Sequence, residues 1–383
     1  MQFNYITEDS ALSQAVNIWM KQAFVAIDTE FVRDKSYYPM LGLVQIAVDG
    51  VCHVIDLVSI KDTTPLKQLI VSPNIVKIIH ACGEDVDALF HHFHQLPSQL
   101  FDTQMAAALL GIGPQVGYSY LVEHYFDKTV PKGLSRADWL ARPLSEDLLN
   151  YAADDVAYLE AIYEKQVNTL KSRGLYDYFL EDCNAILDKK RYHPIPEDMY
   201  LKVKGAFRLK PKELAVLREL AAWRELKARE QNLPRNFIVK DAALLEIAKI
   251  QPNSVGRLSK AKDLHSSDVR RFGQRLLRCV ELGLAIPEMD KPARIVNILD
   301  VQHSKPLLEE LRSIASQAAE SMNIPLSYLV NKKFLEQYIL FRLDKLSEPP
   351  RLWRGWRKAL LQDKFEVSIS RYIKSNALAA ERK

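Results

Sequence analysis

The chain of 383 residues is too long for one ordinary core, and its 48% hydrophobic and 26% charged residues are typical of a globular protein with two or three domains. Its net charge of +4 conceals an asymmetry: residues 1–190 contain 15 basic and 25 acidic residues, whereas residues 191–383 contain 37 and 23. The sequence shows no signal-peptide pattern, no run of ~18 apolar residues and no paired cysteines, so we expect a cytoplasmic protein without a zinc site, disulfides or membrane association.

The first part of the chain, residues 1–190, alternates strand and helix patterns. Short β-rich runs predict four strands, at 24–31, 43–48, 51–57 and 75–81. Helical periodicity predicts helices at 84–94, 103–111, 118–125 and 145–172. The segment 128–143 contains two prolines and a glycine and is expected to form a loop or lid. This alternation indicates an α/β domain with a mixed sheet covered by helices.

The second part contains an internal repeat. A proline-rich linker is expected at 191–208, followed by helical domains at 209–292 and 293–383. Residues 220–239 align without gaps with residues 311–330, at a shift of 91 residues. In both copies a helix ends near an asparagine, and a proline prevents its continuation. The first copy has more basic residues, which favours it as the module that contacts nucleic acid.

Asp28 and Glu30 stand two residues apart in a predicted strand, so their side chains emerge on the same face. Tyr151 and Asp155 stand four apart in a predicted helix and share its apolar stripe. The third segment offers three acids at the start of a helix, Glu84, Asp85 and Asp87, and spacing alone does not distinguish them. Carboxylates that converge at a core edge repel one another unless cations bind them, and a site rich in carboxylate oxygen suits Mg²⁺ or Mn²⁺.

The motifs IDTEF, HACGED and YAADDV together resemble those of the DEDD superfamily of 3′–5′ exonucleases, in its tyrosine subclass. The resemblance selects Asp85 from its neighbours and assigns the catalytic set as Asp28, Glu30, Asp85, Tyr151 and Asp155. The pattern within 223–234 resembles an HRDC module, a helical domain of RecQ helicases and ribonuclease D. One DEDD domain followed by two such modules resembles the bacterial ribonuclease D family across nearly the whole chain.

This resemblance implies an RNase H-like fold and hydrolysis from the RNA 3′ end that releases nucleoside 5′-monophosphates. Two divalent cations, Mg²⁺ or Mn²⁺, are expected at the site. Asp28 would bridge them, the other three carboxylates would complete their coordination, and Tyr151 would orient the attacking water. RNA with a free 3′ end is the expected partner, with tRNA precursors as the expected substrates.

Further residues are candidates for RNA contact. Aromatic side chains suit the stacking of single-stranded bases, and basic side chains suit phosphates. The candidates are Phe31, Tyr37, Gln45, Lys132, Arg136, Arg224, Lys227 and Arg235. Packing in a core or a lid explains the aromatic residues equally well, and a solvated helix face explains many charge runs.

Two alternative functions stay open. The same superfamily includes DNA exonucleases, and HRDC modules occur in DNA helicases, so a 3′–5′ DNA exonuclease is one. An inactive RNA-binding scaffold on the same fold is the other, although four retained and mutually repelling acids argue against it. The sequence indicates no protein partner.

Overall fold

The computed structural model describes residues 3–131, 133–134, 137–191 and 194–381. The chain forms two compact units. One consists of Met1–Val32, Pro39–Arg191 and Val301–Lys383, and the other of Arg33–Tyr38 and Tyr192–Asp300. None of the helices in the described part is both long and apolar enough to cross a bilayer.

The first unit contains a six-stranded mixed sheet with the strand order β1-β4-β3-β2-β5-β6. The strands are β1 (Phe3–Ile6), β2 (Phe24–Val32), β3 (Met40–Val48), β4 (Val51–Asp56), β5 (Val76–Ile79) and β6 (Leu100–Asp102). Strand β3 runs antiparallel to both β2 and β4, whereas β2, β5 and β6 are mutually parallel. The mixed sheet predicted from the sequence is confirmed.

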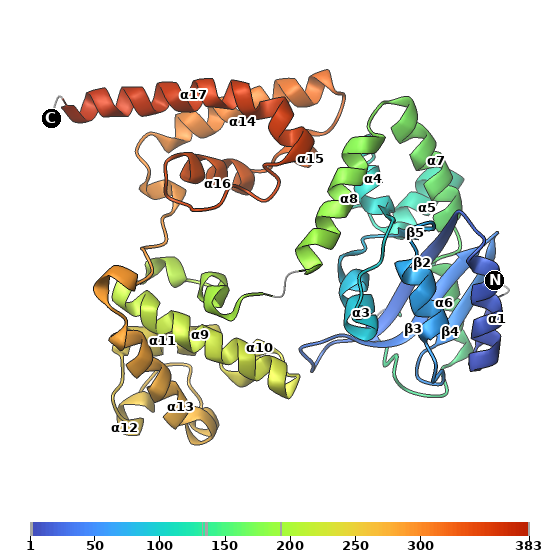
Figure 1. Ribbon diagram of the computed structural model, residues 1–383, viewed down its shortest axis with the longest axis horizontal. Helices are drawn as coiled ribbons and strands as arrows, with labels where there is room; N and C mark the ends of the chain where they lie inside the picture. The colour runs from blue at the N-terminus through green and yellow to red at the C-terminus, as the bar shows by residue number, and fades with distance from the viewer. Residues whose placement is uncertain (1–2, 132, 135–136, 192–193, 382–383) are drawn as a thin grey trace. The chain divides into compact units, whose positions relative to one another are not determined.

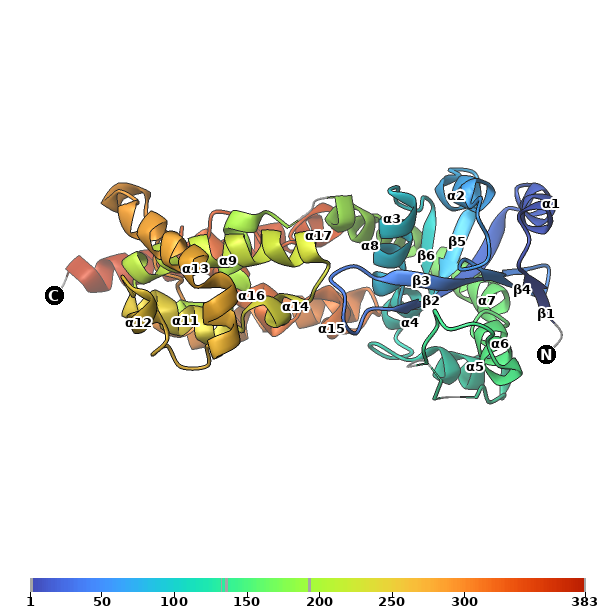
Figure 2. The same ribbon diagram turned by 90° about the horizontal axis from the view of Figure 1, so that it is seen from below.

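Helices cover both faces of this sheet (Figure 2). One side carries α1 (Asp9–Trp19), α2 (Thr64–Val71) and α3 (Gly83–Phe93), and the other carries α4 (Thr103–Leu110), α5 (Tyr118–Phe126), α6 (Glu146–Asp154) and α7 (Leu159–Ser172). The side chains of Val25 and Ile27 are fully buried in the core beneath α1–α3. Because strand residues alternate between faces, Asp28 and Glu30 are directed toward the opposite side.

The two helical modules repeat one arrangement (Figure 1). The first contains α9 (Pro211–Gln231), α10 (Arg235–Ile238), α11 (Asp241–Ile250), α12 (Val255–Leu258) and α13 (Ser266–Ala285). The second contains α14 (Ser304–Ser321), α15 (Leu326–Leu329), α16 (Lys332–Arg342) and α17 (Gly355–Glu381). Asn232 and Asn323 both take left-handed backbone conformations, with φ of 49° and 52°. This geometry ends a helix, so the repeat is present in the structure as well as the sequence.

Much of the predicted linker 191–208 packs as part of the first helical module. It forms two short 3₁₀ helices, Pro196–Lys202 and Ala206–Arg208. Met199 and Val203 are buried in the same core as α9. Apolar residues spaced three to four apart explain this, because they give even a proline-rich segment one buried face.

The second module packs against α8 (Tyr176–Arg191), the last helix of the α/β domain. Asp182 is the centre of this contact and is 7% exposed. It accepts hydrogen bonds from the Tyr328 hydroxyl at 2.7 Å and the Trp356 indole at 3.4 Å, and it pairs with Arg357. A buried carboxylate satisfied in this way is a structural feature of the packing.

Candidate functional site

Asp28 and Glu30 lie on β2, near the middle of the sheet. Asp28 pairs in register with Gln45 of β3, and Glu30 pairs with Leu43. The register shifts directly after Glu30, as it does at a β-bulge. Glu30 is 7% exposed and Asp28 is half-buried. Both acids therefore lie where water only partly solvates their charge.

Asp85 lies in the first turn of α3 and is 8% exposed, whereas its neighbour Glu84 is exposed and Asp87 is half-buried. The hydroxyl of Thr29, which lies between the two acids of β2, donates a hydrogen bond to Asp85 at 2.5 Å. This contact joins α3 to β2. It places Asp85, rather than Glu84, beside the acids of the sheet.

Asp155 lies where the predicted continuous helix 145–172 is interrupted, in the turn between α6 and α7. In an unbroken helix the Tyr158 amide would donate to the Asp154 carbonyl. Instead, the Tyr118 hydroxyl donates to that carbonyl at 2.9 Å and accepts from the Tyr158 amide at 3.0 Å. A side chain inserted between these two groups is a known cause of helix bending. Tyr118 thus bridges the break beside Asp155, a role that sequence periodicity did not indicate.

Three of the acids form one compact cluster. Carboxylate oxygens of Asp28, Glu30 and Asp155 all lie within 4.8 Å of one another. Among the described residues this is the group of acids, histidines and cysteines able to hold a metal ion. The predicted residues Asp28, Glu30 and Asp155 are therefore brought together, with Asp85 close enough to raise the pKa of Asp28.

Burial raises the pKa of every acid at this site, and the charges of neighbouring carboxylates raise it further. Burial raises the pKa of Asp28 well above its usual range, and the charges of Asp85, Asp155 and Glu30 add to this effect. The pKa of Glu30 rises to about 9 for the same two reasons. Burial raises the pKa of Asp85 to about 6 and that of Asp155 to about 7, although hydrogen bonds from Thr29 and Tyr151 oppose these shifts. The negative charges thus lack compensation from the surrounding protein.

The donor set fits hard divalent cations. All the clustered ligands are carboxylate oxygens, which Mg²⁺ and Mn²⁺ prefer, whereas zinc favours thiolate and imidazole. A cation would also remove the repulsion that raises these pKa values. Asp28, Glu30, Asp85 and Asp155 are the side chains that could hold it.

Tyr151 lies half-buried one helical turn before Asp155. Its ring stacks on that of Trp139, with centroids 6.2 Å apart and an interplanar angle of 28°. Burial raises the pKa of Tyr151, and the charges of Asp155 and Glu30 raise it further. The phenol is therefore protonated at neutral pH and is suited to donating a hydrogen bond rather than to acting as a base.

The segment that carries Trp139 is attached to the sheet by Arg142. The Arg142 guanidinium bonds to the buried Asp56 carboxylate at 2.5 Å and to the carbonyl oxygens of Trp139 and Gly42. Gly42 is required here because a Cβ at this position would lie 2.2 Å from the Trp139 carbonyl oxygen. The contact holds the Trp139 ring against Tyr151.

The candidates for RNA contact in the α/β domain have varied surroundings. Phe31 packs against the hydrophobic core, and Gln45 is fully buried. The Tyr37 hydroxyl donates to Glu225 at 2.5 Å, and Arg235 lies over its ring at 5.3 Å. Lys132 and Arg136 lie outside the described residues. The assignment of these five residues to RNA contact stays a prediction.

The basic candidates of the first helical module differ in their partners. Arg224 is 4% exposed and pairs with Asp241 at 2.7 Å, and Arg235 pairs with Glu225. Lys227 is half-buried, with 25% of its side chain exposed, and pairs with the exposed Glu230 at 3.0 Å. Arg224 and Arg235 therefore stabilise the module itself. Of the three side chains, Arg235 is the most exposed, at 37%, followed by Lys227.

Comparisons with known proteins agree with this geometry. A family model described as 3′–5′ exonuclease matches residues 3–171, and one described as HRDC domain matches residues 213–280. The ribonuclease D of Shewanella sp. (strain ANA-3) is 35% identical, over 93% of this chain and 91% of its own. The crystal structure of Escherichia coli RNase D, described as an exoribonuclease involved in structured RNA processing, matches with a TM-score of 0.91. That match has 33% identity and covers 97% of this chain and all of the other.

Proposed function

Since the chain belongs to the ribonuclease D family of metal-dependent 3′–5′ exoribonucleases, we propose that Asp28, Glu30, Asp85, Asp155 and Tyr151 form its catalytic site. The observation that carries this proposal is the set of clustered carboxylates with raised pKa values. A protein maintains such repulsion at a cost in stability, and pKa values shifted in this way are typical of functional sites.

The four carboxylates would hold two divalent cations, Mg²⁺ or Mn²⁺. Asp28 is suited to bridge them because the other three acids all act on its pKa. When bound, such cations make a water molecule more acidic and stabilise charge on the scissile phosphate and the leaving 3′ oxygen. The protein's own contribution is to fix the carboxylate oxygens before the substrate arrives.

Tyr151 would position the attacking water. Its raised pKa keeps the hydroxyl protonated, so it can donate one hydrogen bond to Asp155 and accept another. Trp139, stacked on its ring, restricts the rotation of the phenol. In this role the Tyr151 hydroxyl orients the attacking water and does not itself act as the base.

RNA with a free 3′ end would be the substrate, and nucleoside 5′-monophosphates the products. The E. coli relative is described as acting in structured RNA processing, and we extend that role to this chain. Trimming of tRNA precursors in the cytoplasm is the specific form that we propose. The basic excess of residues 191–383 supports a grip on a polyanion outside the acidic site.

The test is nucleotide release from 3′-labelled single-stranded RNA and DNA, with Mg²⁺, with Mn²⁺ and with a chelator. The wild type should release 5′-monophosphates from RNA only when a divalent cation is present. Asp155→Asn should abolish release, and Asp154→Asn is the matched control because its side chain lies outside the cluster. A tRNA precursor with a 3′ extension should be shortened under the same conditions.

Three results would contradict the proposal. Release in the presence of the chelator would exclude cation-dependent chemistry at this site. An active Asp155→Asn variant would exclude the assigned residues. Equal turnover of DNA and RNA would remove the preference for RNA.

A further inference from the structure

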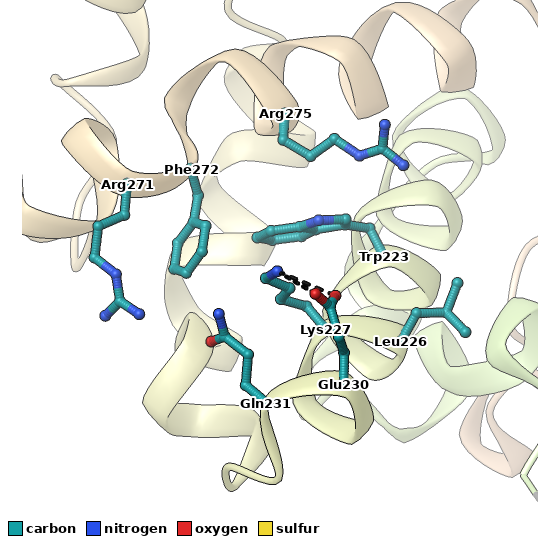
Figure 3. Close-up of a pocket in the computed structure, with 8 residues that line it drawn as sticks. All are labelled: Trp223, Leu226, Lys227, Glu230, Gln231, Arg271, Phe272 and Arg275. Carbon is teal, nitrogen blue, oxygen red and sulfur yellow. Dashed lines mark hydrogen bonds and ion pairs between the residues drawn. The ribbon is translucent and has the colours of Figure 1, made fainter.

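The first helical module contains an open pocket between α9 and α13 (Figure 3). Its volume is about 600 Å³, enough for a nucleotide-sized group. Helix α9 contributes Trp223, Leu226, Lys227, Glu230 and Gln231, and α13 contributes Arg271, Phe272 and Arg275. The pocket lies entirely within one unit of the structure, so its shape depends on this module alone.

The charge of the lining is mainly positive. Three of the lining side chains are basic, Lys227, Arg271 and Arg275, and Glu230 is the acidic one. Glu230 is 66% exposed and pairs with Lys227. The two remaining basic side chains of the lining are the arginines of α13. Both arginines are exposed, and neither forms an ion pair within the described part of the chain. The pocket therefore has uncompensated positive charge available to an anion.

This arrangement differs from that of the other arginines near the same core. Arg224 is paired with Asp241, and Arg229 and Arg235 are both paired with the buried Glu225. Their charges are neutralised by fixed partners, so they add little attraction for a ligand. The basic excess of the first copy of the repeat, residues 220–239, does not identify Arg271 and Arg275, which lie on α13.

An aromatic wall lies beside these arginines. The rings of Trp223 and Phe272 meet edge to face, with centroids 5.3 Å apart, and are 9% and 7% exposed, whereas the neighbouring Leu226 is 54% exposed. In Figure 3, Arg275 lies on one side of the Trp223 ring and Lys227 on the other. Arg271 extends over the Phe272 ring at 4.8 Å. An apolar wall flanked by unpaired guanidinium groups suits a flat ring attached to an anion.

We propose that this pocket is a subsite for single-stranded RNA, in which one unstacked base lies against Trp223, Phe272 and Leu226. The adjoining phosphates bind Arg271 and Arg275. The proposal rests on the proposed function only in taking RNA as the substrate. The first module would then bind the RNA strand through these five residues, apart from the acidic site.

The experiment measures binding of a fluorescent single-stranded RNA oligonucleotide to the full-length chain by anisotropy. The chain carries Asp155→Asn and the buffer contains a chelator, so binding is measured without chemistry and without cations. The double variant Arg271→Gln/Arg275→Gln should weaken binding about tenfold or more. Loss of two phosphate contacts should also reduce the log–log salt slope by about 1.4.

The matched control is Arg270→Gln/Arg278→Gln, which removes the same charge from the same helix at exposed residues outside the pocket lining. It should change the affinity for RNA less than about threefold, because charges outside the pocket attract the strand only at longer range, where salt screens them. Equal weakening by the two double variants would overturn the proposal and leave a diffuse basic surface. Unchanged affinity in the pocket variant would overturn it as well.

Two competitors test whether a base is recognised. An oligonucleotide of the same length without bases should compete about tenfold less well than RNA, since stacking of one base contributes this order of affinity. Equal competition by the abasic strand, or by polyglutamate, would show an anion site with no base contact and would refute the subsite. In a chain that retains Asp155, turnover of bis(p-nitrophenyl) phosphate with Mn²⁺ should be unchanged by Arg271→Gln/Arg275→Gln. Loss of that activity would show that the substitutions disturb the cutting site rather than RNA binding.

Discussion

Glu225 in the first helical module and the clustered carboxylates of the α/β domain are all at least partly buried but differ in their partners. Glu225 is fully buried. It accepts hydrogen bonds from Tyr37 and Arg229 and forms an ion pair with Arg235. Burial raises its pKa, but Arg235, Tyr37 and Arg229 more than offset this and hold the pKa below its usual range. In the acidic cluster, the strongest neighbouring charges are those of the other carboxylates, and the pKa values rise.

This difference in partners separates acids that are neutralised within the fold from the acids that we propose as metal ligands. A buried acid that is already neutralised by arginines has no capacity left for a cation. A buried acid that is repelled by its neighbours is stabilised when a cation binds. Asp182, enclosed by Arg357, Tyr328 and Trp356, belongs to the first kind. Four predictions test this distinction.

The largest effect is expected from Asp85→Asn. It removes the charge of a proposed metal ligand, so we expect nucleotide release to fall by at least about 10³-fold, equivalent to about 4 kcal/mol. Glu84→Gln is the control, because the neighbouring side chain is exposed and outside the cluster. Mn²⁺ titration by electron paramagnetic resonance should show weaker or fewer bound ions in Asp85→Asn alone. Loss of activity in both variants would mean that the general charge near α3 matters, and not one ligand.

The second prediction concerns Glu225→Gln, which should affect stability and leave the chemistry intact. It leaves Arg229 and Arg235 without their common partner. Breaking a fully buried pair costs about 3–5 kcal/mol, and we expect about 2–3 kcal/mol here because Arg235 is 37% exposed. Hydrogen exchange of α9 and α10 measures the loss. Glu230→Gln on the same helix removes only a surface pair and should stay within about 0.5 kcal/mol of the wild type.

Part of this distinction was predictable from the sequence. The two-residue spacing placed Asp28 and Glu30 on one face of a strand, and the structure has that strand in the middle of the sheet. The 91-residue repeat predicted two copies of a helical module with the same asparagine turn. These features follow from local periodicity, which a sequence displays directly.

Other features depend on contacts between distant segments. The hydroxyl that bridges α6 and α7 belongs to Tyr118, which is 36 residues before the carbonyl that it contacts. The placement of Asp85, rather than Glu84, beside the acids of the sheet depends on its contact with Thr29 of β2. Similarly, the basic excess of the first copy did not show which arginines are neutralised, because Arg224 pairs with Asp241 of another helix and both Arg229 and Arg235 pair with the buried Glu225. Pairing of this kind is a property of the folded chain.

The third prediction tests Tyr118 as a positioning residue for Asp155. Tyr118→Phe leaves the Asp154 carbonyl and the Tyr158 amide without their shared partner, so the turn that carries Asp155 should loosen. Outer partners of metal ligands commonly contribute 10–100-fold in affinity, and we expect about tenfold weaker Mn²⁺ binding here. Tyr163→Phe on α7 is the control. A purely structural role would lower the melting temperature without changing Mn²⁺ affinity.

The smallest effect is a pH dependence with opposite signs for the two kinds of acid. Asp155 has a folded-state pKa near 7, above its unfolded value, so the folded state retains a proton that the unfolded state loses. This contribution is present at low pH and is lost as pH rises through about 7. In a chelator, Asp155→Asn should therefore become more stable relative to the wild type as pH rises from 5 to 8, which thermal unfolding at each pH measures.

Glu225 should behave in the opposite way, because its folded-state pKa is lowered. Its contribution is present above the unfolded value near 4.3 and is lost as pH falls through the folded value. The destabilisation in Glu225→Gln should thus be full at pH 7 and shrink in acid. Mg²⁺ should stabilise the wild type at pH 8, so that the wild type becomes more stable than Asp155→Asn. It should leave the difference in stability between the wild type and Glu225→Gln unchanged. If Mg²⁺ moved both differences alike, the cation would act through general screening, and the contrast between repelled and neutralised acids would no longer identify the metal ligands.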